Sequence, residues 1–220
     1  MYRKELYVMR EGYPVKVLVR NYRQADFNEL IDIQRECFPP PFPSELWWNE
    51  EQLKSHLTYY PEGALCIEIN GQLVGSITGL LTDFDPNYPL HSWEEVTDHG
   101  YIRNHNPKGN TLYIVDISVR PSYRKMDLGK VLMQAMYERV VHDGIDRLLG
   151  GGRMPGYHRY SERLSPEGYI EKVLNGELKD PVISFLLRCG RTPVSIIPDY
   201  LEDEESHNHA LLMEWKNPFK

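Results

Sequence analysis

The sequence predicts an α/β fold built on a mixed β-sheet, and three observations carry that prediction. Short runs of alternating or continuous hydrophobic residues, typical of strands, recur between residues 15 and 215. Longer segments between them carry hydrophobic residues at helical spacing. The elements follow in the order β, α, α, β, β, β, α, β, α, β, β, without an internal repeat or a linker-like stretch. We therefore expect a single domain over residues 1–220, with its core at about 15–216.

The first elements are an opening strand and a helix. Hydrophobic and polar residues alternate over 15–20, which predicts a strand with one buried face. Asp26 is placed to cap a helix over 27–38, because its side chain can accept hydrogen bonds from free N–H groups. The proline-rich segment 39–43 must end that helix, since proline lacks the N–H that helix continuation needs.

A second helix and a hairpin come next. Asn49 and Gln52 have the spacing of a capping box, which predicts a helix that runs to about Tyr60. Asn70-Gly71 then separates two hydrophobic runs. Both residues tolerate the positive φ angles of a type I′ turn, so the pair predicts a hairpin with strands over 64–69 and 72–81.

The middle of the chain contains a long segment without periodicity, residues 82–110, which is rich in Asp, Asn, Pro, His and aromatic residues. Long ordered insertions in compact domains are usually functional, and we expect this one to be so. A strand over 111–119 and an amphipathic helix from Leu128 to near Gly144 follow it.

The last third alternates short elements with loops. We expect a short strand over 145–149 and a loop over 150–165. The remaining predicted elements are helices over 167–174 and 181–189 and strands over 192–197 and 210–215, the two strands separated by the acidic loop 202–205.

The composition narrows the class of protein. The net charge is −7, from 25 basic and 32 acidic residues, which argues against general binding to nucleic acid or to anionic membranes. No apolar run is long enough to span a bilayer, and the N-terminal residues lack the apolar core of a signal peptide. Cys37, Cys66 and Cys189 are odd in number and widely spaced, which favours reduced thiols. We expect a cytoplasmic location.

The segment after the strand over 111–119 carries the chemistry. A tight loop there contains Arg124 and Lys125 and leads into the helix that begins near Leu128-Gly129. The free N–H groups at such a helix start form a concave anion site, which the helix dipole reinforces. Gly129 would let a phosphate approach the backbone closely, and Lys130 adds positive charge. A pyrophosphate is the natural occupant.

This segment resembles a known family motif. Val119-Arg-Pro-Ser-Tyr-Arg124, separated by four residues from Gly129-Lys-Val-Leu, resembles the acetyl-coenzyme A motif of the GNAT N-acetyltransferases. Arg124, Leu128 and Gly129 match that motif, whereas Lys125 and Asp127 stand where the family usually has glycines. The order of elements matches along about residues 15–216. The resemblance implies a mostly antiparallel mixed sheet, flanked by helices and splayed between its fourth and fifth strands.

A closer resemblance is carried by several short phrases. His91-Ser-Trp-Glu-Glu-Val-Thr-Asp-His-Gly-Tyr, Asn104-His-Asn-Pro and Gly151-Gly-Arg-Met-Pro-Gly-Tyr-His resemble the acetyltransferase domain that some bacterial proteins carry fused to a carbon–nitrogen hydrolase, or nitrilase-like, domain. That subgroup also departs from the glycine pattern at the loop. The chain resembles a stand-alone version of this domain.

The resemblance implies acetyl-CoA, or another acyl-CoA, as donor substrate. The pantetheine arm would pair with the backbone of Ile117, Ser118 and Val119, and a backbone N–H near Val119 would polarise the thioester carbonyl. The residues expected to hold the pyrophosphate form one run: Arg124, Lys125, Met126, Asp127, Leu128, Gly129 and Lys130. The carboxylate of Asp127 would repel a phosphate unless it points to solvent.

Asp116 is the candidate base. It shares a strand face with Ser118, and an acidic residue near this position in the family deprotonates or orients the acceptor amine, directly or through water. A solvated or salt-bridged carboxylate is the alternative. The family's general-acid tyrosine is absent from the matching segment Phe185–Arg191, so Tyr157 and His158 are the candidate acids, with packed loop residues as the alternative.

Other side chains suit acceptor recognition. His91, Trp93 and Glu94 lie in the long insertion, where GNAT proteins set acceptor specificity, and the alternative is loop packing. Arg153, in a glycine-rich turn, would bind a substrate carboxylate or a coenzyme phosphate, or else brace the loop by a salt bridge. No spacing of His, Asp, Glu or Cys matches a known metal site, so we expect no metal.

These observations predict an N-acyltransferase that moves an acetyl group from acetyl-CoA to a primary amine of a small molecule or peptide, by direct attack in a ternary complex. A second interpretation is a non-catalytic module that binds acyl-CoA and regulates or partners an amide hydrolase. A third is a degenerate fold that binds no CoA. The resemblance also leaves a homodimer open, and acidic charge favours a cationic acceptor.

Overall fold

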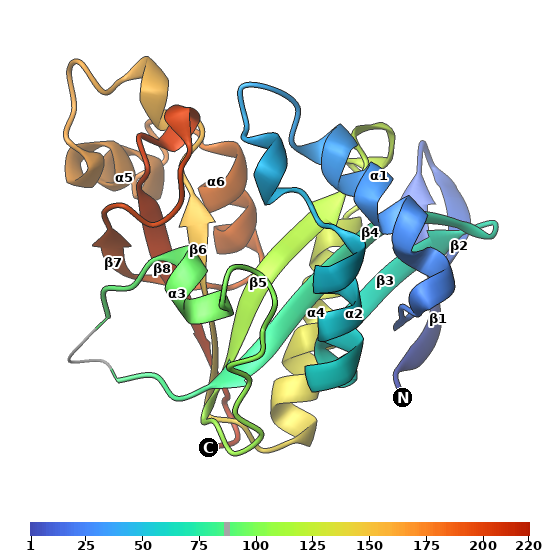
Figure 1. The fold of residues 1–220 in the computed structure, drawn as a ribbon. Helices are drawn as coiled ribbons and strands as arrows, with labels where there is room; N and C mark the ends of the chain where they lie inside the picture. Colours follow the sequence, from blue (N-terminus) through green and yellow to red (C-terminus); the bar gives the residue numbers. More distant parts are fainter. Residues whose placement is uncertain (86–88) are drawn as a thin grey trace.

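The computed structural model describes residues 1–85 and 89–220. Its described strands form one sheet of eight, in the order β1-β2-β3-β4-β5-β6-β8-β7 (Figure 1). The strands are β1 (Arg3–Arg10), β2 (Tyr13–Asn21), β3 (Ala64–Ile69), β4 (Gln72–Thr82), β5 (Thr111–Val119), β6 (Arg147–Arg153), β7 (Thr192–Ile197) and β8 (Ala210–Lys216). The α-helices are α1 (Phe27–Cys37), α2 (Glu50–Tyr59), α3 (Trp93–Thr97), α4 (Leu128–His142), α5 (Pro166–Leu174) and α6 (Pro181–Arg188).

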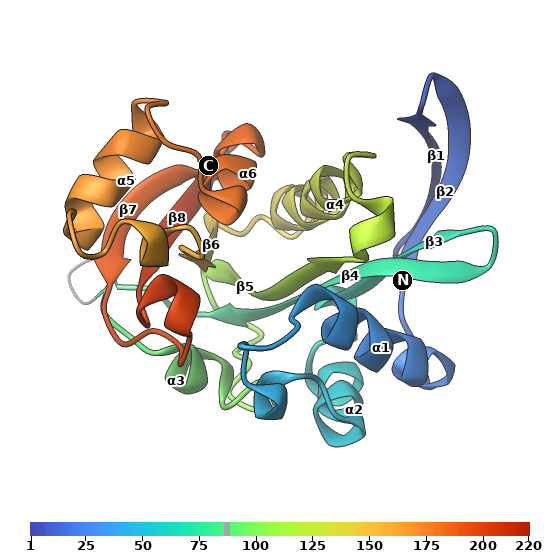
Figure 2. The ribbon, with the colours of Figure 1, turned by 90° about the horizontal axis from the view of Figure 1, so that it is seen from above.

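Helices cover both faces of the sheet. Seen from above, α1 and α2 lie on one face, and α4 and α6 lie on the other (Figure 2). The central strand β4 is buried from Leu73 to Leu81, as a strand covered on both faces must be. Ile33 of α1 and Met136 of α4 are fully buried, so the core has two layers separated by the sheet.

The sheet is mixed, as predicted. β5 and β6 run parallel, and the other neighbouring strands pair antiparallel. The parallel pairing is short, because it joins only Thr111, Leu112 and Tyr113 to residues 147–149. Beyond Tyr113 and Leu149, β5 stays paired with β4 while β6 stays paired with β8, and the two strands diverge (Figure 1). The sheet therefore opens between the strands that the sequence predicted as fourth and fifth.

The chain has a strand that sequence reasoning missed. β1 pairs with β2 through a tight turn at Glu11-Gly12, where both residues have positive φ angles of 51° and 87°. Only Val8 of β1 is buried, and Tyr7 and Met9 are exposed, so β1 has almost no amphipathic signal. The sequence pattern therefore did not reveal the strand before residue 15.

β6 is longer than predicted. The expected strand over 145–149 begins instead at Arg147 and continues through Gly150, Gly151 and Gly152 to Arg153. Glycine is unusual inside a strand, and here close neighbours explain it. A Cβ on Gly151 would lie 2.4 Å from the Tyr200 ring. The expectation of a loop over 150–165 is wrong for its first four residues.

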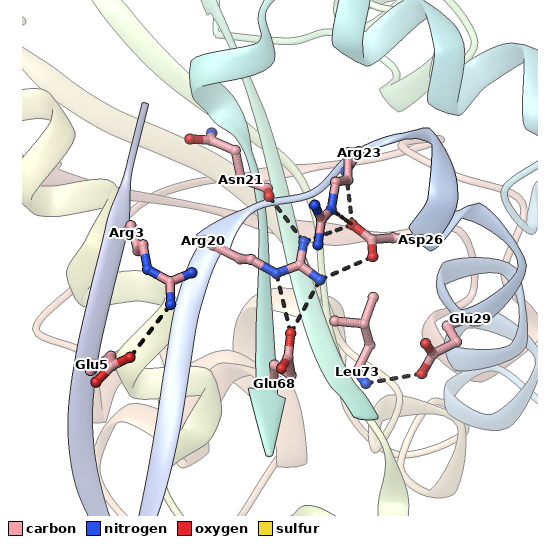
Figure 3. A network of polar contacts seen from close by, with 9 residues as sticks. All are labelled: Arg3, Glu5, Arg20, Asn21, Arg23, Asp26, Glu29, Glu68 and Leu73. Carbon is pink, nitrogen blue, oxygen red and sulfur yellow. Dashed lines mark hydrogen bonds and ion pairs between the residues drawn. The ribbon is translucent and has the colours of Figure 1, made fainter. Parts of the chain in front are cut away.

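The structure confirms some of the local turn and capping predictions but not all of them. The Asn49–Gln52 capping box and the positive φ angles of Asn70 and Gly71 are confirmed. Asp26 stands at the predicted N-cap position of α1, but its carboxylate makes no capping hydrogen bond there. It accepts hydrogen bonds from Arg20 at 2.7 and 3.0 Å and from the Arg23 N–H at 2.8 Å (Figure 3). A buried guanidinium outcompetes the helix N–H groups because an unpaired buried charge is costly.

The long insertion is anchored on α2. It contains a short helix, α3, which Ser92 and Glu95 cap reciprocally and which periodicity did not reveal. The Gln52 side chain donates to the His99 carbonyl at 2.9 Å, and His56 Nε2 lies 2.7 Å from the Gly100 carbonyl. Residues 86–88 of the insertion lie outside the described residues.

Candidate functional site

The opening between β5 and β6 is marked by a β-bulge. In the β4–β5 ladder Thr78 pairs with Asp116 and Gly79 pairs with Ile114, so Val115 has no partner on β4. The Val115 carbonyl instead accepts a hydrogen bond of 3.0 Å from the indole N–H of Trp93. Bulges next to sites re-aim side chains, and this one precedes Asp116.

Asp116 lies at the bulge with a set of neutral donors. The Gln34 amide nitrogen of α1 lies 2.9 Å from Asp116 Oδ2, and the Ser118 hydroxyl lies 2.9 Å from the same oxygen. Gln34 also donates to Ser118 Oγ at 3.1 Å. Burial raises the pKa of Asp116 to about 6, while these hydrogen bonds and the Ile117 N–H oppose the rise. The carboxylate can therefore exchange a proton near neutral pH.

The Val119 carbonyl is shared by two side chains at the end of β5. Cys37 Sγ lies 3.2 Å from this oxygen, and Arg124 Nε lies 3.4 Å from it. Burial, with a smaller contribution from Asp116, raises the pKa of Cys37 to about 11, so this thiol is protonated at neutral pH. The arrangement makes Cys37 a hydrogen-bond donor.

The loop that follows β5 keeps the backbone of a glycine-rich loop without the glycines. Lys125 has φ 71° and Asp127 has φ 55°, the left-handed region that favours glycine. Asp127 is exposed, and its side chain forms no cap on α4. The first turn of α4 contains no acidic residue, so its free N–H groups keep their positive potential.

Some side chains of this loop are buried and others are exposed. Met126 and Leu128 are buried and fix the loop to the core, whereas Arg124, Lys125 and Lys130 are exposed. Asp127 and Lys130 also line a groove of about 220 Å³ between α4 and the N-terminal hairpin. The positive side chains of Arg124, Lys125 and Lys130 are therefore open to solvent in the segment where α4 begins.

Gly129 has a packing role that the sequence did not indicate. A Cβ at this position would lie 3.0 Å from the ring of Phe185 on α6. That distance is tighter than ordinary van der Waals contact, so Gly129 allows α6 to approach the start of α4. The glycine is needed for helix packing as well as being available for a ligand.

The segment after α6 holds a buried cation, Arg191. Arg191 is 3% exposed, and burial lowers its pKa to about 10. Its Nη2 donates to the carbonyl of Met213, the residue that pairs with Pro193 across β7 and β8. Proline has no N–H to give in a ladder, so Arg191 supplies the donor that Pro193 lacks.

The predicted acceptor residues lie in different environments. His91 Nε2 lies 2.8 Å from the hydroxyl of Tyr113, which lies 2.9 Å from that of Tyr200. Burial lowers the pKa of His91, so it is neutral at pH 7. Trp93 lies at the opening through its bond to Val115, whereas Glu94 is exposed.

Arg153 links three segments at the end of β6. Its guanidinium lies 2.6 Å from Asp203 and 3.2 Å from Glu205, and it stands 4.8 Å above the centre of the Phe42 ring. The Phe38 ring lies 5.7 Å from it on the same segment after α1. These contacts match the bracing alternative, with the charge of Arg153 already paired.

Tyr157 and His158 lie in the short helical turn 157–159 after β6. The Tyr157 hydroxyl donates to the Leu164 carbonyl at 3.1 Å, and His158 Nδ1 lies 2.7 Å from the Pro155 carbonyl. Tyr157 is buried and His158 is exposed. Their described hydrogen bonds stay within this loop, so the structure does not bring them to Asp116.

Gln34 is the functional candidate that sequence reasoning missed. The residue is 3% exposed, on a helix whose other buried residues are Phe27, Leu30 and Ile33. A polar side chain on the apolar face of a predicted helix needs a buried partner, and that was the available signal.

The described residues offer neither a metal cluster nor a membrane-spanning helix. Among residues 1–85 and 89–220, no three His, Cys, Asp or Glu side chains gather where they could hold a metal ion. None of the helices in the same ranges combines the length and apolar character that crossing a bilayer requires.

The splayed mixed sheet, the bulged strand and the open helix start define a protein of the GNAT fold. The model of the acetyltransferase (GNAT) family matches residues 27–159, and the chain belongs to this family. It is 54% identical over 217 residues to the uncharacterized N-acetyltransferase YkwB of Bacillus subtilis. The aligned residues are 98% of this chain and 96% of YkwB. The chain is thus a GNAT-type N-acetyltransferase.

A second relative is longer. The probable hydrolase YhcX of Bacillus subtilis is 40% identical over 203 residues, which are 92% of this chain and 39% of YhcX. The chain therefore corresponds to less than half of that protein.

Solved structures share the fold at low identity. The GNAT-like decarboxylase GphF, solved with isobutyryl-CoA, has a TM-score of 0.78 at 23% identity and covers 90% of this chain and 98% of its own. The loading GNATL domain of CurA from Lyngbya majuscula has a TM-score of 0.79 at 19% identity, covering 93% and 99%. The PaiA N-acetyltransferase of Thermoplasma acidophilum, solved with coenzyme A, has a TM-score of 0.53 at 13% identity, covering 91% and 98%.

Proposed function

We propose that the protein transfers an acetyl group from acetyl-CoA to a primary amine of a small molecule or peptide. The observation that carries the proposal is the position of Asp116. Its carboxylate sits at the bulge of β5, beside the edge that β6 leaves open, and the same strand leads directly to the exposed basic loop at the start of α4. The proposed proton acceptor therefore lies on the strand that leads to the proposed anion site.

The donor would lie along that strand. Its pyrophosphate would bind the N–H groups at the start of α4, with Arg124, Lys125 and Lys130 around it. The pantetheine arm would pair with the backbone of 117–119, where β5 has no neighbour on the β6 side. Support comes from the fold neighbours GphF and PaiA, whose structures hold isobutyryl-CoA and coenzyme A.

The chemistry would be direct aminolysis of the thioester. The neutral amine attacks the thioester carbonyl, a C–N bond forms, and the C–S bond then breaks to release the CoA thiolate. Asp116 accepts the proton that the amine loses, directly or through a water molecule. The thiolate takes its proton from water, because the segment Phe185–Arg191 contains no tyrosine that could supply it. No covalent intermediate with the enzyme forms.

A second candidate is supported by the relation to YhcX. The chain resembles 39% of a protein named as a probable hydrolase, so the acyl-CoA site could serve as a module beside a hydrolase. In that case the hydrolase would be an amide-cleaving enzyme of the nitrilase-like kind. A pure binding module would bind acyl-CoA but acetylate no amine.

Calorimetric titration with acetyl-CoA, free CoA and desulfo-CoA tests the proposal. Micromolar binding, weakened at least tenfold in Arg124→Ala and unchanged in the control Arg35→Ala, is expected. Arg35 is exposed on α1 and pairs with Asp32. Absence of binding at millimolar ligand would overturn the donor site.

The base is tested with an amine panel. Asp116→Asn should keep acetyl-CoA affinity and lose at least a hundredfold in turnover. Binding by the wild type without turnover on any amine, together with co-purification of a hydrolase, would favour the binding module.

A further inference from the structure

The Asp116 carboxylate has two oxygens with different surroundings. Oδ2 receives the Gln34 amide N–H and the Ser118 hydroxyl, each at 2.9 Å. The amide nitrogen of Gln34 has two hydrogens, and the second is directed to Ser118 Oγ at 3.1 Å. The three groups form a closed ring of hydrogen bonds around Oδ2. No side chain of the described residues donates a hydrogen bond to Oδ1.

We propose that Gln34 is the positioning residue of the active site, which with Ser118 holds Asp116 Oδ2 and leaves Oδ1 to take the proton of the acceptor amine. The inference rests on the proposed function for its catalytic meaning. It assigns α1 to the catalytic machinery, and it gives the two carboxylate oxygens separate tasks.

The choice of a carboxamide follows from charge. A lysine or arginine at position 34 would pair with Asp116 and favour its charged form strongly, which weakens it as a base. A carboxylate there would repel it. A neutral amide donates two hydrogen bonds and adds no net charge, so it orients the carboxylate while leaving its proton affinity near neutral pH.

The other groups around Asp116 do not compete for this role. Cys37 of α1 and Tyr22 after β2 are titratable side chains that interact electrostatically with Asp116. Burial raises the pKa of both above the neutral range, so both are uncharged. Thr78 pairs with Asp116 across the ladder, and its hydroxyl lies 3.2 Å from the Tyr22 hydroxyl. The Ile117 N–H also stabilises the charged carboxylate.

The direct test is the titration of Asp116 followed by its side-chain carboxyl ¹³C resonance, in protein labelled at aspartate. Wild type should titrate near pH 6. Gln34→Leu and Ser118→Ala should each raise the midpoint by about one pH unit, which is tenfold in proton affinity, because each removes a donor to the charged form. Ser76→Ala is the matched control: Ser76 is a buried serine on β4, paired with Ser118 in the ladder.

Turnover adds a second readout. In an active wild type, the acid limb of kcat/KM should move with the NMR midpoint in Gln34→Leu and Ser118→Ala, with acetyl-CoA affinity unchanged. Midpoints that stay within about 0.2 units of wild type in both variants would overturn the role of Gln34. If Gln34→Leu fails to fold, Gln34→Met takes its place, because methionine keeps an unbranched side chain and removes the amide donor.

The two proposals fail in different ways. The NMR titration needs no acceptor, so a shifted midpoint without any turnover would leave the hydrogen-bond ring intact and count against the transferase. Turnover with an acid limb that neither variant moves would support the transferase and overturn the positioning role.

Discussion

The indole nitrogen of Trp93 lies 3.0 Å from the carbonyl oxygen of Val115 and closes a gap in the sheet. The bulge turns Val115 out of the β4 ladder, and β6 has already diverged, so this carbonyl has no strand partner. A buried carbonyl without a partner costs about 1–3 kcal/mol. The insertion thus stabilises the opening that the fold requires, through one side chain of α3.

Replacing this indole should destabilise the protein. Trp93→Phe removes the N–H donor and leaves the Val115 carbonyl without a hydrogen-bond partner. It also leaves a small void, because Trp93 is only 8% exposed. We expect the free energy of unfolding to fall by about 2–3 kcal/mol, measured by urea denaturation.

A second tryptophan provides the control for that experiment. The indole N–H of Trp47 donates to the Phe38 carbonyl at 2.9 Å, but this side chain is only half-buried. Water can replace the lost donor, so Trp47→Phe should cost less than about 1 kcal/mol. If both variants lose the same free energy of unfolding, the hydrogen bond to Val115 contributes no more than the exposed bond of Trp47.

The loop before α4 should accept glycine at its two strained positions. Asp127 has φ 55°, and its exposed carboxylate lies beside the proposed phosphate site. Asp127→Gly relieves the strain and removes a repulsive charge. We expect acetyl-CoA to bind about 2–5-fold more tightly by calorimetry, with a smaller gain at 0.5 M salt. Lys125→Gly relieves similar strain at φ 71° but removes a cation, so it should weaken binding.

Glu11→Gly separates strain from charge in this comparison. Glu11 has φ 51° in the turn of the N-terminal hairpin. Glycine there should stabilise the protein by up to about 1 kcal/mol and leave acetyl-CoA binding unchanged. A similar gain in affinity in Glu11→Gly and Asp127→Gly would indicate that charge at the loop is irrelevant.

The fold was predictable because its signals are local. The Asn70-Gly71 turn and the Asn49–Gln52 capping box each need only a few neighbouring residues, and both are confirmed. β1 was missed because its strand character comes from pairing with β2, and its side chains are almost all exposed. The glycine-rich end of β6 was missed because a glycine run has no hydrophobic period.

The candidate site was predictable only in part, because it depends on contacts between distant segments. Asp116 could be proposed from its place before the loop, but Gln34 lies 82 residues away and is joined to it only by folding. Asp26 shows the reverse case, since a local capping signal lost to the buried guanidinium of Arg20. A local sequence pattern does not reveal that a distant side chain competes for the same carboxylate.

His56 should make stability depend on pH. It is fully buried, and burial lowers its pKa to about 4, below its ordinary value of 6.5. A group with a lowered folded pKa stabilises the folded state fully above its unfolded pKa, and the contribution is lost as pH falls from 6.5 towards 4. The free energy of unfolding should fall by about 1.4 kcal/mol per pH unit over that range from this group.

The measurement is urea denaturation at a series of pH values between 7 and 4. His56→Gln should flatten the slope, although its stability at pH 7 will be lower because the bonds to Gly100 and Tyr22 change. His158→Gln is the control, since His158 is exposed and its Nδ1 lies against the Pro155 carbonyl of its own loop. A slope identical in His56→Gln and wild type would contradict the assignment.

Gly129 can be tested for its two roles separately. Gly129→Ala places a Cβ 3.0 Å from the Phe185 ring, so α4 or α6 must shift slightly. We expect a loss of about 1–2 kcal/mol in stability, offset in part by the better helix propensity of alanine. Phe185→Leu, which shortens the opposing side chain, should restore much of that loss in the double variant.

The interaction energy between Gly129→Ala and Phe185→Leu distinguishes a helix-packing role of Gly129 from a ligand-binding role. Contact between the added methyl group and Phe185 should appear as an interaction energy of about 1 kcal/mol in the double-mutant cycle. If acetyl-CoA affinity recovers together with stability in the double variant, Gly129 serves helix packing and the ligand depends on it only through the position of α4. If stability recovers while affinity stays low, the methyl group blocks the phosphate itself, and close approach of the ligand to the backbone is the reason for glycine.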